Sequence, residues 1–201
     1  IGLCLVGSEM CIRDRGGAEE DAAGITCSFI ANVGETSMDG LEVEGIWMPT
    51  SALTLRAALG TLDANYDSYD YAGRDIANVA QLLYAPELTW SVGAEHISQV
   101  FGGELILTAN YSFQDEVFTQ TPWAIYDPAT FPKITIDDWE SLDISATYLR
   151  DTENGTFKVI LYGTDVLEDG NRVQRRYTTG SFTWAELAPR QQFGVTVGYE
   201  F

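Results

Sequence analysis

The sequence predicts an all-β fold, an antiparallel β-barrel that spans a membrane. Apolar and polar residues alternate along several stretches of about 8–12 residues, close to the roughly 9–11 residues that a tilted transmembrane strand needs. Short and long connections alternate between these stretches, and outer-membrane barrels have short turns on one side and longer loops on the other. The last stretch ends the chain on Phe201, as expected where an aromatic girdle meets a membrane interface.

The composition of the 201-residue chain argues against several other classes. Aromatic residues make up 12% and charged residues 20%, and no apolar run reaches the roughly 18 residues of a membrane helix. The formal net charge is −19, from 30 acidic and 11 basic residues, and no basic face is present to contact nucleic acid. A solvated surface is the simpler explanation of the acidity, and acidic loops that hold a divalent cation or a cationic ligand are the alternative.

Residues 1–15 (IGLCLVGSEMCIRDR) do not share the alternation. Their apolar part ends at Val6 and has no basic residue ahead of it, so it is too short and wrongly flanked for a signal peptide. The stretch resembles a translated sequencing-adapter fragment. We therefore expect the native chain to begin near Gly16 and to have continued upstream.

The remaining sequence divides into a linker or partial loop over 16–24 and a barrel portion over 25–201. If the first fifteen residues are set aside, Cys4 and Cys11 drop out and Cys27 is the single cysteine. One cysteine forms no intrachain disulfide, and it indicates no metal site.

The first extended region covers residues 25–48. One of its faces carries Leu41, Val43, Gly45 and Trp47. Periodicity alone allows either one long strand or a hairpin with its turn at 34–37 (GETS). Residues 49–52 interrupt the pattern, and a strand with one apolar face then runs from Leu53 to about Tyr66.

Five more alternating stretches complete the chain, at 88–95, 104–113, 142–148, 157–162 and 191–201. The short connections are 49–52, 99–102 and 151–154, and the long ones are 67–86, 118–138 and 167–189. The first long loop includes a candidate helical turn at Ile76–Leu83. A soluble β-sandwich has no physical reason to place every long loop at one end.

The C-terminal strand is apolar on one face, with Phe193, Val195, Val197, Tyr199 and Phe201 at alternate positions. In a barrel this face contacts outer-membrane lipid, so Tyr199 and Phe201 are predicted to be interfacial anchors. The strand also resembles the C-terminal signal by which bacterial outer-membrane proteins engage the barrel-assembly machinery. That resemblance assigns the signal to Val197, Tyr199 and Phe201, with Thr196 where the signal usually has glycine.

The stretch from Asn32 to Tyr66 resembles the TonB-dependent outer-membrane receptor family. The family's N-x-G, G-x-E-x-E, P-T and L-T-L motifs and its aspartate match Asn32, Gly34, Gly40, Glu42, Glu44, Pro49, Thr50, Leu53 and Asp63. Further matches are Ala72-Gly73-Arg74 with Asn78, Ala85-Pro86, and Tyr111 with Asp115-Glu116-Val117. The resemblance covers roughly residues 28–201. The family's G-x-N-L-x-D motif is altered here to Gly163, Asp165, Val166 and Glu168, which loosens the register at that point.

The resemblance implies that 25–48 form one long strand, so the chain holds seven strands, about a third of a barrel of roughly 22. Single-chain bacterial barrels have even strand numbers, so an odd count implies strands upstream. The implied location is the bacterial cell outer membrane. The implied activity is uptake of a siderophore, cobalamin, carbohydrate or similar solute, powered by TonB through a plug domain that this chain lacks.

If the C-terminus is periplasmic, the three long loops are extracellular. They contain residues whose side chains stack on or hydrogen-bond small ligands, namely Asp70, Arg74, Trp123, Tyr126, Arg172, Arg175, Arg176 and Trp184. The alternative is that the aromatic residues belong to the membrane girdle and that the arginines balance nearby acids or lipid phosphates.

Nothing in the sequence marks an enzyme. The single histidine, His96, lies on the lipid-facing side of its strand, and no pair of carboxylates is singled out by spacing. We therefore predict no catalytic residue, metal site or cofactor. Two alternatives to a receptor segment remain. One is a complete eight-stranded barrel with a structural or adhesion role, which needs a hairpin at 25–48 and a signal peptide just upstream, and the other is a soluble β-sandwich module.

Overall fold

The computed structural model of the protein describes residues 34–71, 73–120, 134–167, 172–178 and 182–201, and the backbone of 19–20 and 26–27. These residues form strands, turns and irregular segments. None of them belongs to a helix long and apolar enough to cross a membrane.

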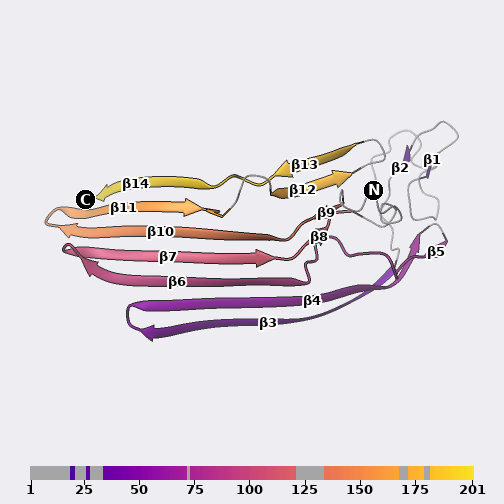
Figure 1. The fold of residues 1–201 in the computed structure, drawn as a ribbon, viewed down its shortest axis with the longest axis horizontal. Helices are drawn as coiled ribbons and strands as arrows, with labels where there is room; N and C mark the ends of the chain where they lie inside the picture. The colour runs from indigo at the N-terminus through magenta and orange to yellow at the C-terminus, as the bar shows by residue number, and fades with distance from the viewer. Residues whose placement is uncertain are drawn as a thin grey trace.

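One antiparallel sheet dominates the described residues (Figure 1). Its long strands are β3 (Gly34–Thr50), β4 (Leu53–Tyr71), β6 (Leu88–Val100), β7 (Gly103–Gln114), β10 (Trp139–Thr152), β11 (Gly155–Thr164) and β14 (Gln192–Glu200). Each of these strands pairs with the long strand that precedes or follows it along the chain. The predicted all-β antiparallel meander of seven strands is confirmed.

The first extended region is one strand where the structure describes it. β3 pairs with β4 continuously from Gly34, opposite Tyr69, to Thr50, opposite Leu53, apart from two local register shifts. The hairpin alternative, with its turn at 34–37, is wrong because these residues pair with β4 instead of turning back. Upstream, β1 (Glu19–Glu20) and β2 (Thr26–Cys27) pair only with each other, so the predicted linker includes one short strand.

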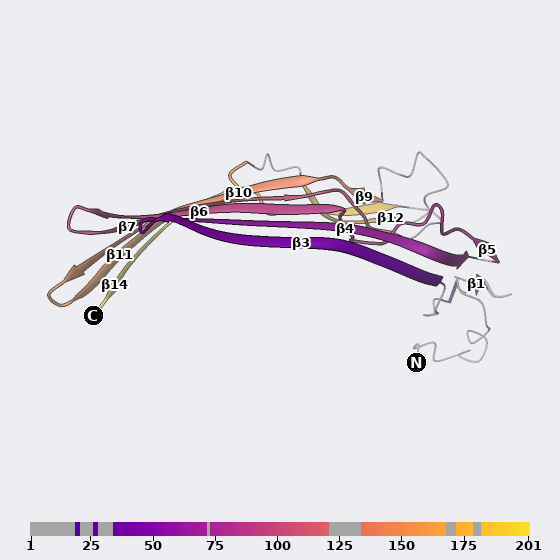
Figure 2. The ribbon, with the colours of Figure 1, turned by 90° about the horizontal axis from the view of Figure 1, so that it is seen from below.

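Short and long connections lie at opposite ends of the sheet. The turns at 51–52, 101–102 and 153–154 lie at the same end as the C-terminus, and the longer connections lie at the other end (Figure 1). Seen after a 90° rotation, β3, β4 and β6 stay close to one plane while β11 and β14 turn out of it, as a twisted sheet requires (Figure 2). The predicted separation of short turns from long loops is confirmed.

The strand register carries the alternation across the whole sheet. In one row, Val195 lies opposite Leu161, and the row continues through Ala146, Leu107, His96 and Leu53. The adjacent row projects to the other side and consists of Gly194, Tyr162, Ser145, Thr108, Glu95 and Thr54. We call these two sides the apolar face and the polar face.

The apolar face is exposed. The exposed fraction is 65% for Val195 and 66% for Trp47, at opposite edges of the sheet. Soluble monomers rarely expose contiguous apolar patches of more than a few hundred Å². On the polar face, the hydroxyls of Thr108 and Ser145 share a hydrogen bond of 2.8 Å, and Arg56 lies 4.0 Å from Glu95. The side of the sheet that a soluble protein would cover is therefore the side left open.

The long connections contain more order than predicted. β4 extends to Tyr71, and β5 (Arg74–Asp75) pairs with it. The loops predicted at 118–138 and 167–189 contain β8 (Val117–Phe118) with β9 (Thr135–Ile136), and β12 (Val173–Thr178) with β13 (Thr183–Leu187). The predicted helical turn is a single turn, in which the Ala80 amide donates to the Ile76 carbonyl at 2.9 Å.

The buried apolar residues of the described chain lie mainly in these connections. Tyr69, Ile76 and Ala80 form one cluster at the tip of β4. Val117, Ile134 and Ile136 are buried around β8 and β9. The loop end thus has its own small cores, whereas the long strands are largely without one.

At Gly40 the backbones of β3 and β4 lie too close together for a side chain on this residue. A Cβ atom at Gly40 would lie 2.5 Å from the backbone carbonyl oxygen of Thr61, whereas a Cβ at Gly45 has no atom within 4 Å. We expect Gly40→Ala to weaken the β3–β4 pairing by about 1–3 kcal/mol, because the backbones must separate to admit the methyl group. Hydrogen exchange of the β3 and β4 amides in detergent micelles measures this change. Gly45→Ala is the matched control, and equal exchange in the two variants would contradict the observed register.

Candidate functional site

The long connections form one continuous layer beyond the sheet. Leu83 of the first connection pairs with Phe118 of the second, and the Tyr84 amide donates to the Phe118 carbonyl at 2.9 Å. In the other direction, β9 of the second connection lies against β12 of the third. Residues far apart in the sequence therefore meet in this layer, which contains most of the predicted ligand-binding residues.

The first long connection begins with a tight turn between β4 and β5 that two aspartates hold in place. Asp70 accepts a hydrogen bond from the Gly73 amide at 2.8 Å. Asp75 accepts hydrogen bonds from the amides of Ala77 and Tyr69, each at 3.0 Å, and these bonds, that of Ala77 foremost, hold the pKa of Asp75 below its usual range. The side chain of Arg74 is exposed. Of the two predicted ligand residues here, Asp70 already shapes the turn and Arg74 faces solvent.

The third connection is tied to the sheet through Arg172. Its Nη2 lies 2.7 Å from Asp165 Oδ2, and its guanidinium lies over the ring of Trp139, 4.7 Å from the centroid. The Asp165 amide in turn donates to Asp143 Oδ1 at 2.7 Å. Both members of the ion pair are largely buried, so the pair is better shielded from water than a surface bridge. Arg172 thus joins the base of the β12–β13 hairpin to β10.

The hairpin itself presents aromatic and charged side chains outward. Trp184 lies opposite Tyr177, and both are exposed. Arg175 Nη1 lies 3.6 Å from Glu186 Oε2, also in the open, where such a pair contributes little to stability. Arg176 is partly buried. The hairpin is therefore the part of the described loop layer that offers exposed aromatic rings beside guanidinium groups.

The structure does not bring all the predicted ligand residues together. β5, with Arg74, lies at the far tip of β4, whereas β12 and β13 lie beside the other edge of the sheet (Figure 1). Trp123 and Tyr126 lie outside the described residues. The described candidates therefore form two separate groups.

A polar hollow of about 210 Å³ lies between β4 and the first two connections. Its lining includes Leu62, Asp63, Asn65, Gln81, Glu87, Asp115, Glu116 and Phe118. Asp63, Asp115 and Glu116 are positions that match the family motifs, yet spacing alone could not show that they share a hollow. Across the described ranges, no three Asp, Glu, His or Cys side chains are grouped closely enough to hold a metal ion.

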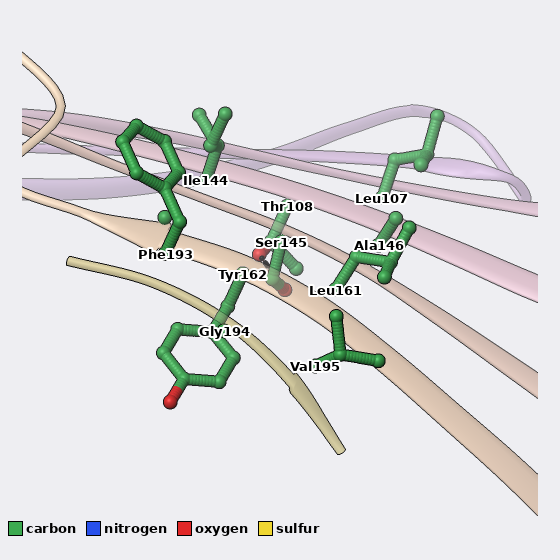
Figure 3. Close-up of a pocket in the computed structure, with 11 residues that line it drawn as sticks. Leu107, Thr108, Ile144, Ser145, Ala146, Leu161, Tyr162, Phe193, Gly194 and Val195 are labelled. Atoms are coloured by element: carbon green, nitrogen blue, oxygen red, sulfur yellow. Dashed lines mark hydrogen bonds between the residues drawn. The ribbon is translucent and has the colours of Figure 1, made fainter. Parts of the chain in front are cut away.

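Two larger hollows open on the apolar face. One, of about 610 Å³, is shown in Figure 3, where Ile144, Leu161 and Val195 project to one side of the strands and Tyr162 to the other. The second, of about 620 Å³, is lined by small residues such as Gly45 and Ala94 together with larger side chains such as Trp47. Both are shallow depressions in the exposed apolar surface, with too few polar groups to orient a polar ligand.

The predicted assembly-signal residues lie along this same face. Val197 pairs with Val159, and Tyr199 pairs with Phe157. Phe201 follows β14, fully exposed, with its ring centroid 6.5 Å from that of Tyr199. The aromatic end of the chain is thus presented at the short-turn end, where no other described strand covers it.

Arg172 provides a test of the loop layer. We expect Arg172→Ala to loosen the β12–β13 hairpin by about 1–3 kcal/mol, because the buried Asp165 carboxylate loses its charged partner. Hydrogen exchange over 173–187 measures the loss. Arg175→Ala removes an exposed pair from the same hairpin and should change exchange little. If the two variants show the same hydrogen exchange over 173–187, Arg172 does not support the hairpin.

Comparison with known proteins gives a likeness of fold. No family model matches the sequence, and no curated protein matches it. Among solved structures, the ferric yersiniabactin uptake receptor FyuA from Yersinia pestis is 15% identical with a TM-score of 0.64, covering 83% of this chain and 24% of the receptor. BauA, the ferric preacinetobactin receptor from Acinetobacter baumannii, is 17% identical with a TM-score of 0.65, covering 92% and 25%.

At these identities the likeness concerns the fold alone, and the chain spans about a quarter of the length of each receptor. The predicted fold class, an antiparallel β-barrel fragment, is thereby confirmed.

Proposed function

We propose that this chain is the C-terminal barrel segment of a TonB-dependent outer-membrane receptor that takes up a scarce solute. The observation that carries the proposal is the exposed apolar face of a continuous seven-stranded meander. In the proposed orientation this face contacts lipid and the polar face lines the interior of the barrel. The two solved structures that share this fold are receptors for ferric ligands, so a siderophore is one candidate solute beside cobalamin and carbohydrate.

The open edges of the sheet support a larger barrel. β3 and β14 are the outermost strands of the described sheet, and each leaves one row of backbone groups without a strand partner. In hydrocarbon every backbone N–H and C=O needs an internal partner, so a membrane-spanning sheet must close on itself. Further strands of the same receptor would supply that closure, and its plug domain would provide the contact with TonB.

The two ends of the sheet have different roles in this proposal. The short turns and the aromatic C-terminus face the periplasm, and Val197, Tyr199 and Phe201 serve barrel assembly. The loop layer faces the outside, so the solute first meets the β12–β13 hairpin with Arg175, Arg176 and Trp184. Arg172 supports that hairpin from below, and Asp70 and Arg74 form a second contact group at the tip of β4.

A pair of neighbouring residues on β14 tests which face contacts lipid. Val195 and Thr196 are both exposed but project to opposite faces. We expect Val195→Arg to destabilise the β-sheet of the chain in detergent micelles by up to about 2–4 kcal/mol, because the guanidinium enters hydrocarbon, whereas Thr196→Arg should have a much smaller effect. Urea titration of the micelle-bound chain, followed by circular dichroism, measures both. Equal midpoints for the two variants would contradict the proposed orientation.

A further inference from the structure

The turn between β6 and β7 has an unusual residue at its first position. Phe101 has φ +53° and Gly102 has φ +74°, so both central residues are left-handed, as in a type I′ hairpin. Such turns favour Asn-Gly, because asparagine and glycine tolerate positive φ and a bulky aromatic residue does not. Phenylalanine therefore occupies a position whose backbone conformation it does not favour.

The ring of Phe101 contributes little to packing within the described chain. It is 88% exposed, so it can have few contacts with its neighbours. The turn is instead supported through its backbone, where the Tyr148 hydroxyl donates to the Phe101 carbonyl at 3.2 Å. Gly103 makes room for this contact, since a Cβ there would lie 2.8 Å from the Tyr148 ring. Strain at an exposed aromatic side chain is a basis for a functional hypothesis, and the position of the turn in the fold then decides which partner the ring meets.

The position of the turn indicates the chemistry of that partner. It lies at the end of the sheet that also carries the C-terminus (Figure 1). Tyr148, Phe157 and Tyr199 project from the apolar face near this end, and the Tyr199 hydroxyl lies 3.1 Å from Thr152 Oγ1. Phe101 therefore extends an existing aromatic band, and aromatic rings of this kind concentrate where a bilayer meets water.

We propose that Phe101 is a membrane anchor, inserted from the β6–β7 turn into the phospholipid headgroup interface at the short-turn end of the sheet. This inference rests on the proposed membrane-spanning function. The anchor fixes how deeply the β6–β7 hairpin lies in the bilayer. The backbone strain at Phe101 is tolerated because only a large apolar ring at this position reaches the interface.

Tyr84 provides a matched control. It is an aromatic residue with φ +53° and an exposed fraction of 55%, but it belongs to the loop layer at the opposite end of the chain's long strands. Phe101→Asn and Tyr84→Asn therefore relieve the same backbone conformation and remove an exposed ring in each case. Phe101→Trp keeps an interfacial ring at the turn.

The experiment dilutes the 201-residue chain and its variants from urea into phosphatidylcholine vesicles and measures bound protein by flotation. We expect Phe101→Asn to weaken partitioning roughly three- to tenfold, through loss of one aromatic ring from the interface, while Tyr84→Asn and Phe101→Trp stay close to the parent chain. Circular dichroism in detergent micelles should show that Phe101→Asn keeps its β-sheet content, since Asn-Gly suits the turn.

The outcomes separate the anchor from the function on which it rests. If the parent chain binds vesicles and Phe101→Asn binds equally well, the anchor is wrong and the membrane-spanning function stands. If Tyr84→Asn weakens binding as much as Phe101→Asn, the effect does not belong to the short-turn end, and the anchor is again wrong. If the parent chain does not bind vesicles, both proposals fail.

Discussion

The structure depends on one constraint, the two-residue period of a β-strand combined with a register that keeps that period aligned from strand to strand. Because β14, β11, β10, β7 and β6 pair without a bulge, the alternate positions that carry most of the apolar side chains fall on the same side of this part of the sheet. A slip of one residue in any strand would place polar groups among apolar ones. The exposed apolar surface is thus a property of the whole sheet and follows from its continuous pairing.

The loop layer depends on the sheet but is stabilised by different interactions. Along the strands, stability comes from backbone pairing, with few buried side chains. In the connections it comes from small apolar clusters around Ile76 and Ile134, and from the buried ion pair of Arg172 with Asp165. This division is what the proposed function requires, since there the strands contact lipid while the loops hold a defined shape in water.

The sequence was sufficient to predict the seven long strands, because alternation is a local signal, and it was less informative wherever long-range pairing decides the structure. The turn signals at 34–37 allow a local hairpin as well as a long strand, and pairing with β4 keeps these residues extended. The β12–β13 hairpin has weak alternation and was predicted as loop. The contact of Arg172 with Trp139 joins two distant segments, so residue type could mark Arg172 as a candidate for binding but could not show that it supports the hairpin.

The most direct test of the account is whether the apolar face requires an apolar environment. The measurement is the molar mass of the 201-residue chain by size-exclusion chromatography with light scattering, with and without detergent, alongside circular dichroism. If this requirement holds, we expect aggregation in buffer alone and dispersed chains with β-sheet content in detergent, because the apolar face and both sheet edges are open. A monomeric β-sheet protein in buffer without detergent would contradict it.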